Sequence, residues 1–103
     1  MNKLYQKGRE REYKVMELLR KEGYRVSRSA GSHGAADVIA AKDGHVLLVQ
    51  VKSGRARMKK EELEELILWG RSFNGDAEVW HFKGRGVLEK RTVHRARKVG
   101  PPH

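Results

Sequence analysis

The sequence predicts an α/β fold in which a sheet of about five strands is flanked by helices, in the order α-β-β-β-α-β with room for a final strand. Two observations carry this prediction. Two apolar runs of strand length flank Asp43-Gly44, and Asp-Gly between apolar runs is a strong hairpin signal. Two other segments repeat their apolar residues with the 3.6-residue period of a helix. The 103 residues suffice for a single domain with a modest core, and residues 94–103 are expected to form a flexible basic tail.

The first helix is expected at residues 7–22, because Gly23 is a usual helix stop. At 100° per residue, Glu12 falls within its apolar stripe. A carboxylate that faces a sheet is costly unless it is paired or metal-bound. The helix dipole would favour an acid near the N-terminus, which explains the sign of Glu12 but not its face. The other members of the stripe are Gly8, Val15, Met16, Leu19 and Gly23.

The hairpin brings three polar side chains together. If Asp43-Gly44 forms the turn, the antiparallel register places Asp37 opposite Gln50. Lys52 shares the face of Gln50, because strand side chains alternate with period two. Both faces nearer the turn are apolar, as in strands that are covered on each side. The opposite face is expected to hold Ala36, Val38 and Ala40 against Val51, Val49 and Leu47.

An acid, an amide and an ammonium at one end of a buried hairpin suit metal-assisted hydrolysis of a phosphodiester. Carboxylate and amide oxygens are ligands that Mg²⁺ accepts, and they leave positions for water and a phosphate oxygen. Lys52 would orient the attacking water or offset charge in the transition state. The alternative is an ordinary strand-end ion pair between Asp37 and Lys52, with Gln50 as a bystander.

The rest of the chain supplies the remaining elements. Strands are expected at residues 24–28, 77–82 and 87–93, and a basic loop at "SGRARMKK" leads into a second helix at residues 59–73. Trp69 lies beside the apolar stripe of that helix and is a candidate dimer contact. The stripe comprises Leu63, Leu66, Ile67, Gly70 and Phe73, whereas Glu61, Glu62, Glu64 and Glu65 are expected to be solvated.

The formal net charge of +10 indicates a polyanionic partner such as DNA, although a basic run can also be only a solvated face. The charge is concentrated in three groups. One directly follows the hairpin (Lys52, Arg55, Arg57, Lys59 and Lys60), one is N-terminal (Lys3, Lys7, Arg9 and Arg11), and one is C-terminal (Lys90, Arg91, Arg95, Arg97 and Lys98).

Residues 7–54 resemble the archaeal-type Holliday junction resolvases of the PD-(D/E)xK nuclease superfamily. The matching features are Gly8 four residues before Glu12, the "RSAGS" loop that ends at Ser32, Asp37 at the second strand, and Gln50-x-Lys52 in place of E-x-K. The resemblance implies a restriction-endonuclease-like core with a central mixed sheet. It also implies a homodimer that resolves four-way DNA junctions with Mg²⁺, for which Mn²⁺ can substitute.

By the same resemblance, Asp37, Gln50 and the backbone carbonyl of Val51 would hold the metal, and Glu12 would support it directly or through water. Ser32 would contact the site or the scissile strand. The residues expected to bind DNA are Lys7, Arg9, Arg11, Arg28, Ser29, His33, Arg55, Arg57, Lys59 and Lys60. His33 can equally be an ordinary polar loop residue.

Gln50 is the departure from the family pattern. Glutamine keeps an oxygen ligand but removes a negative charge, so metal affinity should fall. Two alternatives therefore stay open: a less selective repair or phage-type nuclease of the same superfamily, and a catalytically impaired module that binds branched DNA. The chain has no cysteine and no apolar stretch long enough for a membrane span, so no membrane partner is expected and a cytoplasmic location is the simplest expectation.

Overall fold

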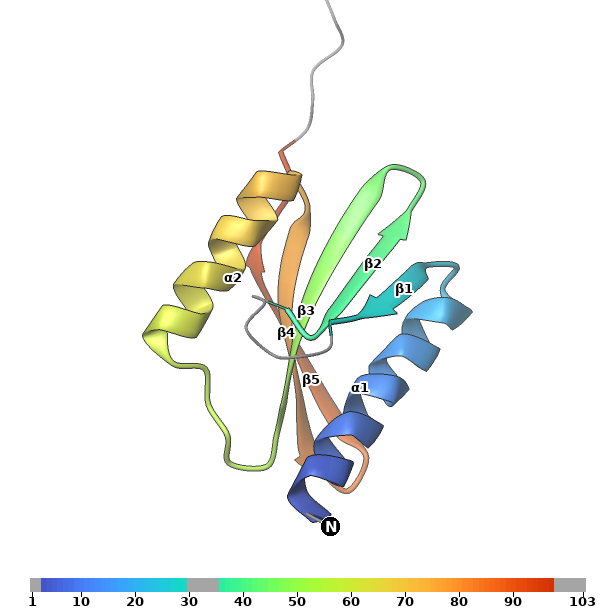
Figure 1. Cartoon of the computed structure of the whole chain (residues 1–103), viewed down its shortest axis with the longest axis vertical. Coiled ribbons are helices and arrows are strands. Elements are labelled where there is room, and N and C mark those ends of the chain that lie inside the picture. Colours follow the sequence, from blue (N-terminus) through green and yellow to red (C-terminus); the bar gives the residue numbers. More distant parts are fainter. Residues whose placement is uncertain (1–2, 30–35, 98–103) are drawn as a thin grey trace, which may run out of the picture.

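The structure, a computed structural model, describes residues 3–29 and 36–97, with side chains described from residue 9 onward. It contains a five-stranded sheet with one helix on either side (Figure 1). In chain order the elements are α1 (Lys3–Lys21), β1 (Arg25–Arg28), β2 (Val38–Lys42), β3 (His45–Ser53), α2 (Lys60–Phe73), β4 (Asp76–Gly84) and β5 (Val87–His94). Neither helix in the described part of the chain has the length and apolarity needed to cross a membrane.

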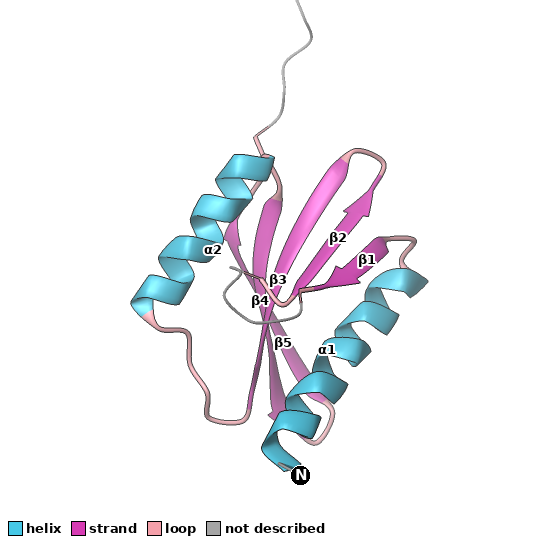
Figure 2. Ribbon diagram, viewed as in Figure 1, coloured by secondary structure: helices cyan, strands magenta, loops and turns pink. Residues whose placement is uncertain are grey.

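The strands lie in the sheet in chain order, β1-β2-β3-β4-β5 (Figure 2). All neighbours pair antiparallel except β3 and β4, which are parallel because α2 forms the crossover between them. The sheet is therefore mixed, and the predicted α/β architecture with a fifth strand is confirmed.

The core has two layers because β2 and β3 alternate their side chains between the two faces of the sheet. On one face Val38 and Val49 pack with Leu19 of α1, and Trp80 of β4 completes this cluster. On the other face Leu48 packs with Leu66 of α2 and with residues of β4. Both faces of the hairpin are thus covered, as the apolar pattern predicts.

The β2–β3 hairpin has the predicted register. Lys42 pairs with His45, and Ile39 pairs with Leu48. Asp43 and Gly44 both adopt positive φ angles, 49° and 78°. This backbone twist joins two strands by the shortest turn, and Asp-Gly tolerates it well.

Three local predictions about packing and boundaries are wrong. The first helix begins at Lys3, four residues before the predicted start. The chain bends at Asp37 and β2 begins only at Val38, so Ala36 packs on the α2 side of the sheet instead of beside Val38. Phe73, expected in the apolar stripe of α2, is 45% exposed, because it ends the helix and stacks on Trp69 with ring centroids 5.9 Å apart.

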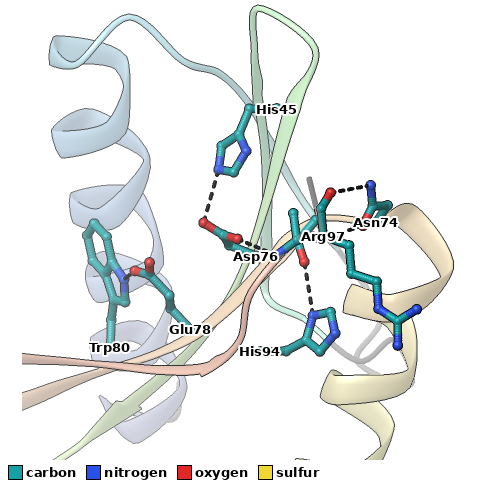
Figure 3. Close-up of polar contacts among 9 residues, drawn as sticks. His45, Asn74, Asp76, Glu78, Trp80, His94 and Arg97 are labelled. Carbon is teal, nitrogen blue, oxygen red and sulfur yellow. Dashed lines mark hydrogen bonds and ion pairs between the residues drawn. The ribbon is translucent and has the colours of Figure 1, made fainter. Parts of the chain in front are cut away.

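The predicted tail does not begin at His94. β5 runs through His94, whose Nδ1 lies 3.1 Å from the Gly75 carbonyl oxygen, and the Ala96 N–H donates to Asp76 at 2.7 Å. The Asn74 side chain bonds both backbone groups of Arg97 (Figure 3). These contacts hold residues 94–97 against the start of β4 and the end of α2, and residues 98–103 lie outside the described part.

Candidate active site

Asp37 lies immediately before β2 and extends the hydrogen bonding with β3 by one residue past the N-terminal end of β2. Its backbone N–H donates to the Val49 carbonyl at 2.9 Å, and its carboxylate accepts the Val51 N–H at 2.8 Å. The carboxylate thus occupies the place on β3 where a strand partner would otherwise bond. The N–H and C=O of one strand residue point to the same side, so the Val51 carbonyl is directed toward the same edge as Asp37.

The surroundings of Asp37 disfavour its negative charge. Burial raises the pKa of its carboxyl above the ordinary value of 3.8, and the Val51 N–H opposes that shift. The carboxylates of Glu12 and Glu62 raise the pKa further, whereas the Lys52 ammonium lowers it. A cation bound here would offset the unfavourable negative charge of a partly buried carboxylate that has two acidic neighbours.

Lys52 reaches toward α2 and forms an ion pair with Glu62, with Nζ 2.9 Å from Oε2. The Lys52 side chain is only 16% exposed, and that of Glu62 is 34% exposed. Gln50 lies two residues earlier on β3 and therefore on the same face. The end of the hairpin where Asp37, Gln50 and Lys52 are predicted to converge thus also holds an acid from α2. The convergence of all three on one metal site stays a prediction.

Glu62 is the site residue that the sequence interpretation missed, since the expectation was a solvated acid. Its second oxygen, Oε1, accepts the Lys59 N–H at 3.2 Å at the start of α2. The hydrogen bond from Lys52 lowers the pKa of Glu62, which keeps it ionised at neutral pH. Glutamate three residues after a helix start often turns back to bond the entering chain, and this spacing was the available signal.

Glu12 is paired with a cation. Its Oε1 lies 2.7 Å from Nε of Arg28, and both side chains are less than one-quarter exposed. Arg28 also lies over the ring of Tyr13, 5.4 Å from its centroid. This pairing neutralises an acid on the apolar stripe of α1, while Glu12 stays close enough to raise the pKa of Asp37. Metal support by Glu12 stays a prediction.

The donor set suits a hard divalent cation with few protein ligands. Within residues 3–29 and 36–97, no three His, Cys, Asp or Glu side chains are arranged to hold a metal ion. The candidate donors are instead one carboxylate and two neutral oxygens, from Asp37, Gln50 and Val51. Mg²⁺ commonly binds through one or two carboxylates and retains several waters, so these residues fit it.

The other predicted site residues that the structure describes lie in three places. The Ser29 N–H donates to the Asp37 carbonyl at 2.9 Å, so Ser29 is adjacent to the site. The loop between β3 and α2 follows Ser53 and carries exposed cations, namely Arg55, Arg57 and Lys59, with Lys60 at the start of the helix. Arg9 and Arg11 lie on α1 near Glu12 in sequence. Ser32, His33 and the side chain of Lys7 fall outside what is described.

Comparison with known proteins is consistent with this geometry. A model of the family described as archaeal Holliday junction resolvase (Hjc) matches residues 3–100. The crossover junction endodeoxyribonuclease Hjc of Methanocaldococcus jannaschii is 40% identical over 78 residues, which are 73% of this chain and 58% of that relative. The chain therefore spans less than two thirds of the length of this curated relative.

Among solved structures, Hjc from Archaeoglobus fulgidus, described as a Holliday junction resolvase from an archaeal hyperthermophile, matches with a TM-score of 0.75. The two sequences are 26% identical, and the match covers 89% of this chain and 80% of the other.

Proposed function

Because this chain belongs to the archaeal Holliday junction resolvase family, we propose that it is a divalent-metal-dependent endonuclease that hydrolyses phosphodiesters of four-way DNA junctions. The observation that carries the proposal is the partly buried Asp37 carboxylate, held on β3 beside Gln50 and Lys52. The family match and the name of the curated relative support junctions as the substrate. Comparing cleavage of synthetic junctions with that of linear duplexes tests it.

The proposed roles follow from the position of each group. Asp37, Gln50 and the Val51 carbonyl would hold Mg²⁺, which Mn²⁺ can replace, and Glu12 would support the ion directly or through water. When bound, the ion supplies a water of lowered pKa and neutralises charge on the phosphate. Lys52 directs its ammonium to the scissile phosphate or to the attacking water, and Glu62 holds that ammonium in place. Arg28 and Ser32 position the strand.

The remaining candidate residues would hold the DNA backbone. Cations that contact phosphates release counterions and give salt-dependent binding. In this proposal they flank the site on both sides, from α1 and from the loop that precedes α2. The cations are Lys7, Arg9 and Arg11 on the α1 side, and Arg55, Arg57, Lys59 and Lys60 on the α2 side; Ser29 and His33 are the other candidates.

We also propose a homodimer, since a four-way junction needs two cuts and a two-fold pair of sites supplies them. The proposed contact is an apolar patch on the outer face of α2, formed by Leu68, Trp69 and Phe73. Leu68 and Trp69 are 52% and 41% exposed, and the two rings of the patch stack. Exposed aromatic clusters on one face are typical of protein interfaces.

Replacing Trp69 with glutamate should convert the dimer to a monomer, because a buried interface tryptophan commonly contributes about 2 kcal/mol or more and a charge there would be desolvated. Analytical ultracentrifugation measures the change. Val87→Glu is the matched control, since Val87 is an exposed apolar residue outside α2, at the start of β5. A monomeric unaltered protein, or a Trp69→Glu variant that still dimerises, would contradict the proposal.

A second candidate function rests on Gln50, which leaves the site with one negative charge fewer than E-x-K. In this alternative the chain binds branched DNA without cutting it. A third possibility is a less selective repair or phage-type nuclease, for which linear duplexes would be cut as fast as junctions. Cleavage of junctions by the unaltered protein excludes the second candidate, and a strong preference for junctions excludes the third.

Gln50→Glu is expected to tighten divalent-metal binding by at least about tenfold, because a carboxylate within about 4 Å of a cation adds a large attraction even at the effective dielectric of a protein surface. Isothermal titration calorimetry with Mg²⁺ or Mn²⁺ gives the affinity. Without metal, the same variant should unfold at a lower temperature, because the new charge lies beside Asp37. Gln50→Ala, which removes the oxygen donor, should weaken binding; equal affinities for all three proteins would remove position 50 from the metal site.

A further inference from the structure

A row of directly paired residues runs from the candidate site across the sheet, from β3 to β4 and β5. Gln50 pairs with Val79 of β4, and Val79 pairs with Arg91 of β5. Two residues further along the strands, Lys52 pairs with His81, which pairs with Glu89. Directly paired residues share a face, so Arg91 lies on the α2 face about 10 Å from the site, two strand spacings away.

A cavity of about 280 Å³ opens above this row, between the loop that precedes α2 and the strands β4 and β5. It is slightly smaller than the roughly 300–1,000 Å³ of sites for drug-sized ligands, so a small group suits it better than a cofactor. Lys52 lines it, which makes it continuous with the candidate active site. The other lining residues are Ala56, Arg57, Met58, Leu63, Val79, His81, Glu89 and Arg91.

The cavity carries surplus positive charge. The ammonium of Lys52 is balanced by Glu62, and the carboxylate of Glu89 is balanced by Lys83 at 2.9 Å. Lys83 also lowers the pKa of Glu89, which keeps that carboxylate ionised at neutral pH. In contrast, Arg57 and Arg91 form no ion pair with any described residue. Two guanidinium groups that line one small cavity without acidic partners suit a phosphate, which arginine binds through paired hydrogen bonds.

The loop that carries Arg57 is fastened beside the cavity. The Gly54 N–H donates to the Phe82 carbonyl at 2.9 Å, and the Gly54 carbonyl lies 2.7 Å from Nε2 of His81. Both contacts tie the base of the loop to β4, three residues before Arg57. This preorganisation reduces the ordering that ligand binding would require.

We propose that this cavity is a second phosphate site, in which Arg57 and Arg91 bind a phosphodiester of the cut strand close to the scissile one. The proposal rests on the nuclease function proposed above and extends its substrate contact from β3 to β5. In this arrangement Lys52 faces the scissile group, and the two arginines hold the strand and fix which phosphodiester is presented to Asp37.

Junction binding in EDTA tests the proposal without depending on cleavage. Arg91→Gln is expected to weaken binding about 5- to 10-fold, and to reduce the slope of log affinity against log salt by about 0.7–0.9, the change for one lost phosphate contact. Arg95→Gln is the matched control, because it removes the same charge from an exposed residue just after the C-terminal end of β5 that does not line the cavity. Equal losses in the two variants would overturn the proposal.

A scan with single methylphosphonates, which are uncharged, identifies the phosphate. One substitution near the cut should weaken binding of the unaltered protein but not weaken binding of Arg91→Gln further, because the partner has already gone. Fully additive losses at every position would overturn the proposal. The two proposals can fail independently. If the unaltered protein shows this coupling but does not cut DNA, the nuclease function is contradicted and the phosphate site is retained. If it cuts DNA without this coupling, the phosphate site is contradicted and the nuclease function is retained.

Discussion

Replacing Asp37 with asparagine is expected to lower junction cleavage by at least about 10³-fold while making the fold more stable at neutral pH. The rate should fall because the variant loses the one carboxylate of the donor set formed by Asp37, Gln50 and Val51, and Lewis-acid stabilisation amounts to several kcal/mol. The Val51 N–H can still donate to the amide oxygen, so the strand geometry should persist. Single-turnover cleavage measures the first effect and thermal unfolding measures the second.

The stability effect has a defined pH dependence. Because burial raises the folded-state pKa of Asp37, the native protein holds this proton at a pH where the unfolded chain, with its ordinary value of 3.8, has released it. The stability of the unaltered protein therefore declines as pH rises from about 3.8 through the folded pKa, and the deficit persists at neutral pH. Asp37→Asn should raise the melting temperature at pH 7 and have no advantage below pH 3.8, where aspartic acid is neutral in both states.

Asp43→Asn is the matched control for both measurements. It removes the same charge from the hairpin turn, where Asp43 has φ 49° and asparagine tolerates that conformation. Its cleavage rate should stay within about twofold of the unaltered rate, on the order of 0.4 kcal/mol in activation free energy. An Asp37→Asn variant that retains more than a tenth of the unaltered activity would remove Asp37 from the proposed centre.

Lys52→Ala is expected to lower the single-turnover cleavage rate by about 10²- to 10³-fold, the usual loss when one preorganised charge-stabilising group is removed. Junction affinity should change much less, because many other cations remain. Lys60→Ala is the control, since Lys60 is 84% exposed and only loosely paired with Glu64. A Lys52→Ala rate equal to the Lys60→Ala rate would contradict a role in the chemical step.

The same experiment separates Lys52 from its partner. Lys52→Ala leaves Glu62 unpaired beside Asp37, so the variant should also lose stability, and adding Glu62→Gln should restore stability without restoring cleavage. Glu62→Gln alone keeps the ammonium but loosens its position. It should therefore reduce the cleavage rate more than junction affinity, whereas Glu61→Gln, on an exposed neighbour, should change neither.

The β2–β3 hairpin and its register from the turn to the Val38–Val49 pair were predictable because they depend on local rules. Asp-Gly fixes the turn, the turn fixes the register, and the alternation of a strand then places Gln50 and Lys52 on one face. The bend at Asp37 was not predictable in the same way, since it depends on the residue at which the regular pairing of β2 with β3 begins. It reversed the face of Ala36 while it placed the Asp37 carboxylate on the Val51 N–H.

The residues that tertiary packing brings to the site could not be predicted from the sequence. Four glutamates near the start of α2 look alike in sequence, and only the seating of the helix on the sheet selects Glu62 as the partner of Lys52. Arg91 reaches the row of Gln50 through a parallel pairing and a second antiparallel one, and no short-range rule gives either register. The hydrogen bonds that hold residues 94–97 likewise depend on side chains some 20 positions away.

The most direct test of the central claim is strand-resolved cleavage of a synthetic four-way junction by the unaltered protein in Mg²⁺, beside a linear duplex of the same sequence. The account predicts paired nicks on two strands of the junction, little cutting of the duplex, and loss of both nicks in the Asp37→Asn variant. Absence of cutting in Mg²⁺ and in Mn²⁺, or equal cutting of the duplex, would contradict it.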